Sequence, residues 1–154
     1  MTIATHPFDP FQFHDNLVHG ISFHVADFIC ELILDIDYIV SWPDCDSAEA
    51  ELPHFSVAEG SLKFSYVTDL VVHIDWGTEG YAAGTSGISI NEITRETVVT
   101  ALHVPTYYQW YVRMTDQQSV ISFGASSLSL ELRGKPLTID RQFLVDNERT
   151  KRQK

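Results

Sequence analysis

Two stretches of strictly alternating polar and apolar residues constrain the fold of this chain more than any other feature. They cover residues 31–40 (ELILDIDYIV) and residues 70–76 (LVVHIDW). Successive side chains of a β-strand point to opposite faces of the sheet, so each stretch has one apolar and one polar face. We therefore predict two strands whose apolar faces are buried in a core. The polar faces carry the acidic and imidazole groups: Glu31, Asp35, Asp37, His73 and Asp75.

Shorter alternating segments predict the remaining strands. They lie at residues 17–25, 62–66, 88–93, 97–104, 106–114, 120–123 and 127–133. About seven to nine short strands separated by turns are typical of a mainly β protein, which we expect to be an antiparallel sandwich or a partly open barrel. One helix is expected at residues 141–151, because Thr138 or Asp140 can accept hydrogen bonds from its first amides.

The length of 154 residues predicts a single domain with a buried core. We divide it into an extended N-terminal arm (residues 1–13), a β domain (14–137) and a C-terminal helix with a basic tail (138–154). The chain has no apolar run near the ~20 residues that cross a membrane, so no membrane association is expected. Its start lacks the basic and apolar regions of a signal peptide, and a cytoplasmic location is expected.

The net charge of −11 comes from 21 acidic and 10 basic residues. Four of the ten basic residues lie between Arg149 and Lys154, so the preceding body has six basic against 21 acidic residues, a charge of −15. Such a surface repels phosphate, and nucleic acid is not expected as a partner. It would attract a basic protein and accelerate the encounter. The alternative is that the acidic excess only keeps the protein soluble.

The common nucleotide and hydrolase motifs are missing from the sequence. It has no G-x-x-x-x-G-K-[ST] phosphate loop, no G-x-G-x-x-G after a strand and no G-x-S-x-G nucleophile elbow. We therefore predict no catalytic residue and no cofactor, and we favour a role other than that of an enzyme.

One group of residues could nevertheless hold a metal ion. Asp35 and Asp37 share a strand face about 6–7 Å apart, and His73 and Asp75 have the same spacing. Carboxylates with an imidazole suit Zn²⁺ or Mn²⁺ if the two strands are neighbours. The alternative is an ordinary solvated sheet face. Neighbouring like charges destabilise a sheet, so a basic partner would relieve a crowded acidic face.

A second candidate surface lies on the predicted strand at residues 106–114. Tyr107, Tyr111 and Arg113 share its polar face, and Tyr and Arg are favoured anchors of protein interfaces. With Asp35 and Asp37 they form the candidate interaction residues, unless they simply cover the outside of the sheet. An exposed edge strand could also pair two copies as a homodimer.

Several short motifs distributed over the chain resemble those of one family. They are Phe13-His-Asp15, Leu34-Asp-Ile-Asp-Tyr-Ile39, Val67-Thr-Asp-Leu70, Ile74-Asp-Trp76, Ser122-Phe-Gly-Ala-Ser126 and Arg133-Gly-Lys-Pro136. The chain resembles in them a family of small uncharacterised bacterial β-rich proteins. The resemblance implies a β-rich domain and carries no activity or catalytic residue. In size, acidity and β character the chain is also similar to the immunity proteins of toxin systems.

These observations favour an acidic cytoplasmic interaction protein that binds a basic protein partner and acts like an immunity protein. The main alternative is a metal-dependent enzyme or metal-binding module built on Asp35, Asp37, His73 and Asp75. A small-molecule binder in the mouth of a barrel is a third hypothesis. The spatial relation of the two acidic stretches separates the first two, since only adjacent strands could bring the four side chains together.

Overall fold

The computed structural model describes residues 8–44, 54–75 and 87–150. These residues form a mainly β structure with eight strands and no helix. The strands are β1 (Leu17–Ala26), β2 (Ile29–Ser41), β3 (Phe55–Ser65), β4 (Thr68–His73), β5 (Ile88–Thr97), β6 (Tyr108–Met114), β7 (Val120–Ala125) and β8 (Ser127–Ile139).

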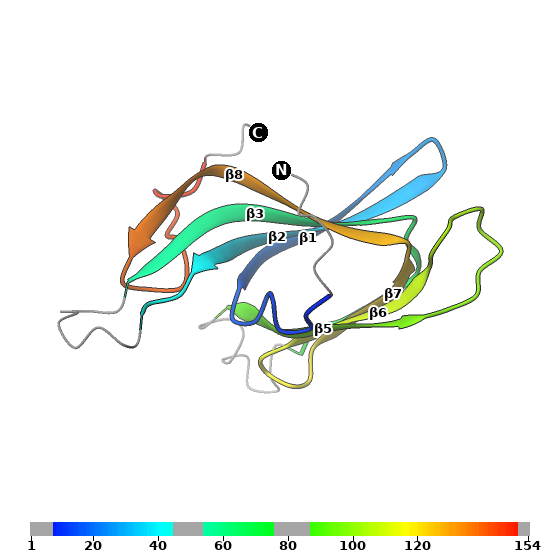
Figure 1. The fold of residues 1–154 in the computed structure, drawn as a ribbon, viewed down its shortest axis with the longest axis horizontal. Coiled ribbons are helices and arrows are strands. Elements are labelled where there is room, and N and C mark those ends of the chain that lie inside the picture. Colours follow the sequence, from blue (N-terminus) through cyan, green and yellow to red (C-terminus); the bar gives the residue numbers. More distant parts are fainter. Residues whose placement is uncertain (1–7, 45–53, 76–86, 151–154) are drawn as a thin grey trace.

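All eight strands are antiparallel neighbours in one open sheet with the order β4-β7-β6-β5-β1-β2-β3-β8 (Figure 1). The link between its two halves is short, because β1 and β5 pair only at Leu17 with Ser89 and at Val18 with Ile88. The sheet folds over at this link, so that β1, β2, β3 and β8 face the other four strands across one core.

The core confirms the inward face predicted for residues 31–40 only as far as Tyr38, because Val40 is 42% exposed. The buried face predicted for residues 70–76 is wrong, since β4 ends at His73 and Val72 is 46% exposed. Leu32, Leu34 and Ile36 of β2 are completely buried. They belong to one apolar cluster with residues of the other half, where Phe64 packs its ring at 5.2 Å from Trp110 and 4.6 Å from Phe123, both in edge-to-face geometry. Burial of these large side chains between the two halves is the main stabilising contribution of the fold.

A bent ribbon joins the two halves at the side opposite the β1–β5 link. One side of the ribbon is β3 followed by β4, and the other is β7 followed by β8, with bends at residues 66–67 and 126. The buried hydroxyl of Tyr107 lies 2.7 Å from the Thr68 hydroxyl and donates to the Tyr66 carbonyl at 3.0 Å. Tyr107 thus fixes the bend between β3 and β4, where Tyr66 has a positive φ of 59°.

The described part of the N-terminal arm lies against β5, with residues 10–15 in turns and not extended. The Pro10 carbonyl accepts a hydrogen bond from the Ile93 amide at 2.9 Å, and the Phe13 side chain is buried. The arm therefore covers the edge of β5 beyond the point where β1 leaves it. Residues 1–7 lie outside the described part of the chain.

Two of the predicted elements are wrong. β5 ends at Thr97, and residues 98–107 form an irregular connection instead of a strand over 97–104, because the apolar residues there find no opposite layer: Val99 is fully exposed. The C-terminal helix is also absent, since β8 continues to Ile139 and residues 140–150 are turns and irregular backbone. β8 tolerates Pro136 because it is an edge strand.

Within the described residues, no helix is long and apolar enough to cross a membrane.

Candidate functional site

The acidic residues of β2 form a buried cluster with a carboxylate of β3. Asp35, Asp37 and Glu59 lie on the face opposite the core, and Asp37 stands directly across from Glu59 in the ladder. Their exposed fractions are 6, 0 and 6%. The polar face that could have been solvated is therefore closed, and its three carboxylates need positive partners.

The cover is residues 140–150, which we call the C-terminal strap. Its Arg149 binds Asp37 and also Asp35, the latter at 2.8 Å between Nη2 and Oδ1. Two backbone amides of the strap donate to the same carboxylates, from Leu144 to Asp37 at 2.9 Å and from Thr150 to Glu59. These bonds replace the helical hydrogen bonds that the sequence led us to expect, which explains why the strap is not a helix.

Arg133 on β8 completes the neutralisation from the other side. Its Nη2 lies 2.5 Å from Asp35 and 3.6 Å from Glu59. Two guanidinium groups thus serve three carboxylates, which we call the acidic cluster. Charge-assisted bonds of this kind are the strong ones in proteins, and they are needed here because an unpaired buried charge is very costly.

His19 on β1 adds an imidazole to the acidic cluster. Its Nε2 lies 2.7 Å from Asp37 Oδ2. Burial, followed by repulsion from Arg149, lowers the pKa of His19 below its ordinary value of 6.5. The ring is therefore neutral at pH 7 and donates its Nε2 proton to Asp37, which leaves Nδ1 as an acceptor.

The second half of the predicted metal site lies elsewhere. His73 belongs to β4, at the opposite edge of the sheet order from β2 and β3, and Asp75 follows β4 with its amide bound to Ser119 Oγ at 2.8 Å. Asp35 and Asp37 are held by arginines instead. The four residues do not meet, and in the described ranges no group of three or more His, Cys, Asp and Glu could hold an ion.

The second predicted surface is divided between the inside and the outside of the fold. Tyr107 is buried at the bend and does not contribute to a surface patch. Tyr111 and Arg113 do lie together on the outer face of β6, where the guanidinium is 5.1 Å from the ring centroid. Arg113 also donates to Thr94 at 2.9 Å and lies 3.5 Å from Glu92, so it is already engaged within the sheet.

A site that sequence reasoning missed is the hairpin of β1 and β2, drawn in blue, which extends beyond the rest of the sheet (Figure 1). β1 pairs with β2 along this length, whereas on its other side no described strand pairs with it beyond Val18. Ile21, Phe23 and Val25 point toward the core side, but no opposite layer covers them, and Phe23 and Val25 are 67 and 61% exposed.

The turn of this hairpin determines which backbone groups face outward. Asp27 and Phe28 have φ values of 50° and 63°, as in a two-residue type I′ turn between the paired Ala26 and Ile29. Starting from such a turn, residue pairs that exchange backbone hydrogen bonds alternate along the two strands with pairs that do not. The residues with exposed apolar side chains, Ile21, Phe23 and Val25, therefore also direct their amide and carbonyl groups away from β2. We call residues 19–28 the hairpin edge.

Phe28 is the most unusual residue of the hairpin edge. It is fully exposed, at 104%, and adopts a left-handed conformation that disfavours bulky side chains. Asn-Gly is the ordinary choice for such a turn, and Asp-Phe in its place is a local contradiction between sequence and structure. This contradiction is the sequence signal that could have identified the site.

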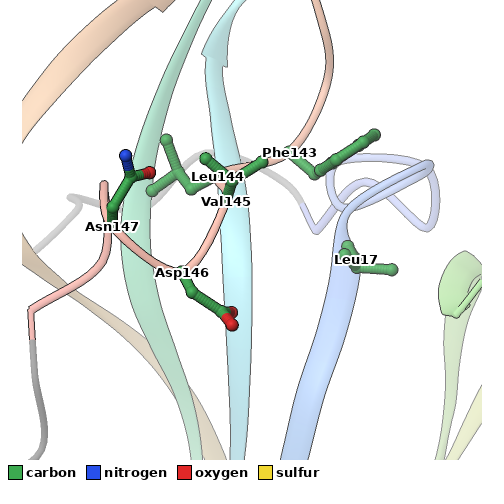
Figure 2. A pocket seen from close by; sticks show the side chains of 6 residues that line it. All are labelled: Leu17, Phe143, Leu144, Val145, Asp146 and Asn147. Atoms are coloured by element: carbon green, nitrogen blue, oxygen red, sulfur yellow. The ribbon is translucent and has the colours of Figure 1, made fainter.

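A pocket of about 580 Å³ opens between the start of β1 and the C-terminal strap (Figure 2). Its lining residues are Leu17, Phe143, Leu144, Val145, Asp146 and Asn147. The pocket lies beside the acidic cluster, because the Leu144 amide and the His19 ring both bind the same oxygen of Asp37.

Comparison of the chain with protein-family models and with curated proteins gave no match. The family resemblance of its short motifs therefore remains a prediction.

Proposed function

We propose that this protein is an interaction domain that binds an extended segment of a basic partner protein along the hairpin edge. The observation that carries the proposal is Phe28, a fully exposed aromatic ring in the strained turn of the hairpin that also exposes Phe23 and Val25. Residues held in unfavourable backbone conformations concentrate at functional sites. An aromatic ring here stabilises nothing within the described fold, but it can anchor a partner.

Strand addition is the binding mode that fits this surface. Sheet edges usually carry lysine, proline or a bulge that prevents pairing with other chains. β1 contains no Asp, Glu, Lys, Arg or Pro, and its one register shift lies between Val18 and Gly20, before the outward backbone groups of Ile21, Phe23 and Val25. A segment added to this edge would gain main-chain hydrogen bonds and place alternate side chains against Phe23 and Val25.

The charge of the chain favours a basic partner. Arg133 and Arg149 are paired with the three carboxylates of the acidic cluster, and the remaining 8 basic and 18 acidic residues give the rest of the protein a charge of −10. The resulting negative field would steer a basic protein toward the domain. Neutralisation of a basic toxin, in the manner of an immunity protein, is the biological role that we propose for such binding.

Two matched variants test this proposal. Phe23→Lys places a charge on the exposed apolar face, at a residue whose backbone faces outward. His24→Lys places the same charge one residue further on the opposite face, where the backbone is paired with Glu31 of β2. Wild type and both variants are used to capture partners from the native host at two salt concentrations, and the captured proteins are identified.

We expect a basic protein that binds wild type and the His24→Lys variant, is lost with Phe23→Lys and dissociates at high salt. In the complex, the amides of Ile21, Phe23 and Val25 should exchange more slowly with deuterium. Equal binding of that partner to the Phe23→Lys variant would contradict the proposal. Light scattering supplies a further check: a dimer of the purified chain that Phe23→Lys abolishes would show that the occupant is a second copy instead.

A further inference from the structure

The pocket beside the acidic cluster combines two kinds of surface. The side chains of Leu17, Leu144 and Val145 provide an apolar wall, and Asp146 and Asn147 provide a carboxylate and an amide. In Figure 2, Leu17 lies on β1 and the other labelled residues lie on the strap across from it. The volume of about 580 Å³ lies within the range of small-ligand sites and exceeds what one side chain needs.

The charges around this pocket favour a cation. Asp146 forms no ion pair with the described residues, whereas the arginines nearest in sequence are engaged elsewhere, Arg141 with Glu148 and Arg149 with Asp37. The nearest imidazole, His19, is neutral at pH 7 because burial and Arg149 lower its pKa. No positive group of the described chain therefore competes for the Asp146 carboxylate.

We propose that this pocket binds an alkylguanidinium or alkylammonium group, the side chain of an arginine or lysine. Such a side chain has an apolar stem with a charged end, which matches a wall of Leu17, Leu144 and Val145 that ends at Asp146. Arginine suits the pocket better than lysine, because the guanidinium group is weakly hydrated and can bind the Asp146 carboxylate with two parallel hydrogen bonds. The Phe143 ring already has the Arg141 guanidinium 5.9 Å from its centroid. The source of the side chain, a basic partner protein, rests on the proposed function.

The position of the pocket fits a side chain that comes from a partner bound along the hairpin edge. A segment paired along the hairpin edge reaches the body of the domain at Val18, where β5 takes over the pairing with β1. Leu17, the next residue, is part of the pocket. Leu17 lines the pocket and His19 binds Asp37 beside it, so a side chain of the segment on the face of these two residues would lie next to the opening.

The test uses small probes, so that it does not depend on the partner. N-acetyl-arginine methylamide and the uncharged N-acetyl-norleucine methylamide, which retains the apolar stem without the guanidinium group, are titrated into the full ¹⁵N-labelled chain. We expect the arginine probe to shift the amide signals of Leu17, Val145, Asp146 and Asn147 with a millimolar dissociation constant, and the norleucine probe to bind about fivefold more weakly.

Asp146→Asn should weaken binding of the arginine probe about fivefold. Asp140→Asn is the matched control, because it removes the same charge from the same strap at a residue outside the pocket lining, and it should leave binding unchanged. Equal affinity for the two probes, an equal effect of the two variants, or no shift of the four amides would overturn the assignment.

The two proposals can fail independently. If the arginine probe shifts the four amide signals but the partner binds the Phe23→Lys variant as tightly as wild type, the pocket proposal stands and the hairpin-edge proposal fails. A partner that depends on Phe23, combined with no probe binding, would retain the hairpin edge and reject the pocket.

Discussion

Arg149 forms an ion pair with Asp37, a residue that precedes it by 112 positions and is completely buried. The contact connects the C-terminal strap to the middle of β2, and the Leu144 amide supports it by binding the other oxygen of the same carboxylate. The face predicted as an acidic surface is thus a buried contact between β2 and the strap, and we call the ion pair of Arg149 with Asp37 the joint. Because a buried carboxylate without a partner is very costly, the joint needs its arginine.

Arg149→Met should reduce the free energy of unfolding by about 3–5 kcal/mol, since it leaves Asp37 without its arginine and Asp35 with Arg133 alone. Urea denaturation followed by tryptophan fluorescence measures the change. Lys135→Met is the control, because it removes the same charge from an exposed position on β8 and should change stability by less than about 0.5 kcal/mol. Equal effects of the two variants would show that the joint contributes nothing.

The stability of the fold should fall as the pH drops through about 6.5. The pKa of His19 is lowered in the folded state by burial and by Arg149, so the unfolded chain takes up this proton at a higher pH than the folded chain does. Stability is then fully present above 6.5 and is lost below it. Glu148 adds a separate loss at more acidic pH, because its hydrogen bond with Arg141 lowers the pKa of the carboxyl.

Denaturation midpoints between pH 5.5 and pH 8 test this dependence. His19→Asn removes the titrating group and should flatten the profile in that range, although the variant can be less stable at every pH. An unchanged slope in the variant would assign the pH dependence to other groups.

Phe28→Gly should raise the free energy of unfolding by about 1 kcal/mol, because glycine adopts the left-handed turn without strain. The same change should weaken partner binding by about tenfold or more through loss of the exposed ring. Asp27→Asn serves as the control, since it also suits the turn and retains the ring. Gain of stability with unchanged binding would mean that Phe28 has no role in recognition.

Tyr107→Phe should cost about 1–2 kcal/mol by removing the hydroxyl that joins Thr68 and the Tyr66 carbonyl. Tyr108→Phe is the matched control, because the Tyr108 hydroxyl forms no hydrogen bond with the described residues. Thermal unfolding of both variants measures the difference. A similar melting temperature for the two would show that the bend does not depend on this hydroxyl.

Gly124→Ala should also destabilise the bend, by about 1–3 kcal/mol. An added Cβ would lie 2.7 Å from the Tyr107 hydroxyl oxygen and 2.8 Å from Thr68 Oγ1. Combining Gly124→Ala with Tyr107→Phe removes one of the two clashing oxygens, so the double variant should lose less stability than the sum of the single ones. Strict additivity would contradict the close approach.

Alternation alone predicted the strands and the inward residues of β2, because a period of two is a local property of the chain. Leu32, Leu34 and Ile36 are therefore buried as expected. The alternating pattern failed at residues 97–104, where β5 ends and no opposite layer covers the chain. The N-cap signal of Thr138 and Asp140 failed to predict the strap, because tertiary contacts decide its backbone. Leu144 illustrates this, since its amide is bound to Asp37 of β2 and is not available to a helix.

The acidic cluster could not be predicted from the alternating pattern of β2. Nothing close to Asp35 and Asp37 in sequence indicates that Arg133 and Arg149 cover them, because those contacts span 98 to 114 positions. The hairpin edge was missed for a related reason. Ile21, Phe23 and Val25 alternate like any core strand, and only the arrangement of the other strands leaves them uncovered.

The long separation of Asp37 and Arg149 has a consequence during synthesis on the ribosome. At about 5–20 residues per second, Arg149 is made roughly 6–20 s after Asp37. Until then Asp37 lacks its arginine, because Arg133 pairs only with Asp35 and Glu59, and burying Asp37 without a cation is very costly. The acidic surface that the sequence indicates thus exists on the growing polypeptide and disappears when the strap closes, which makes this closure a late step of folding.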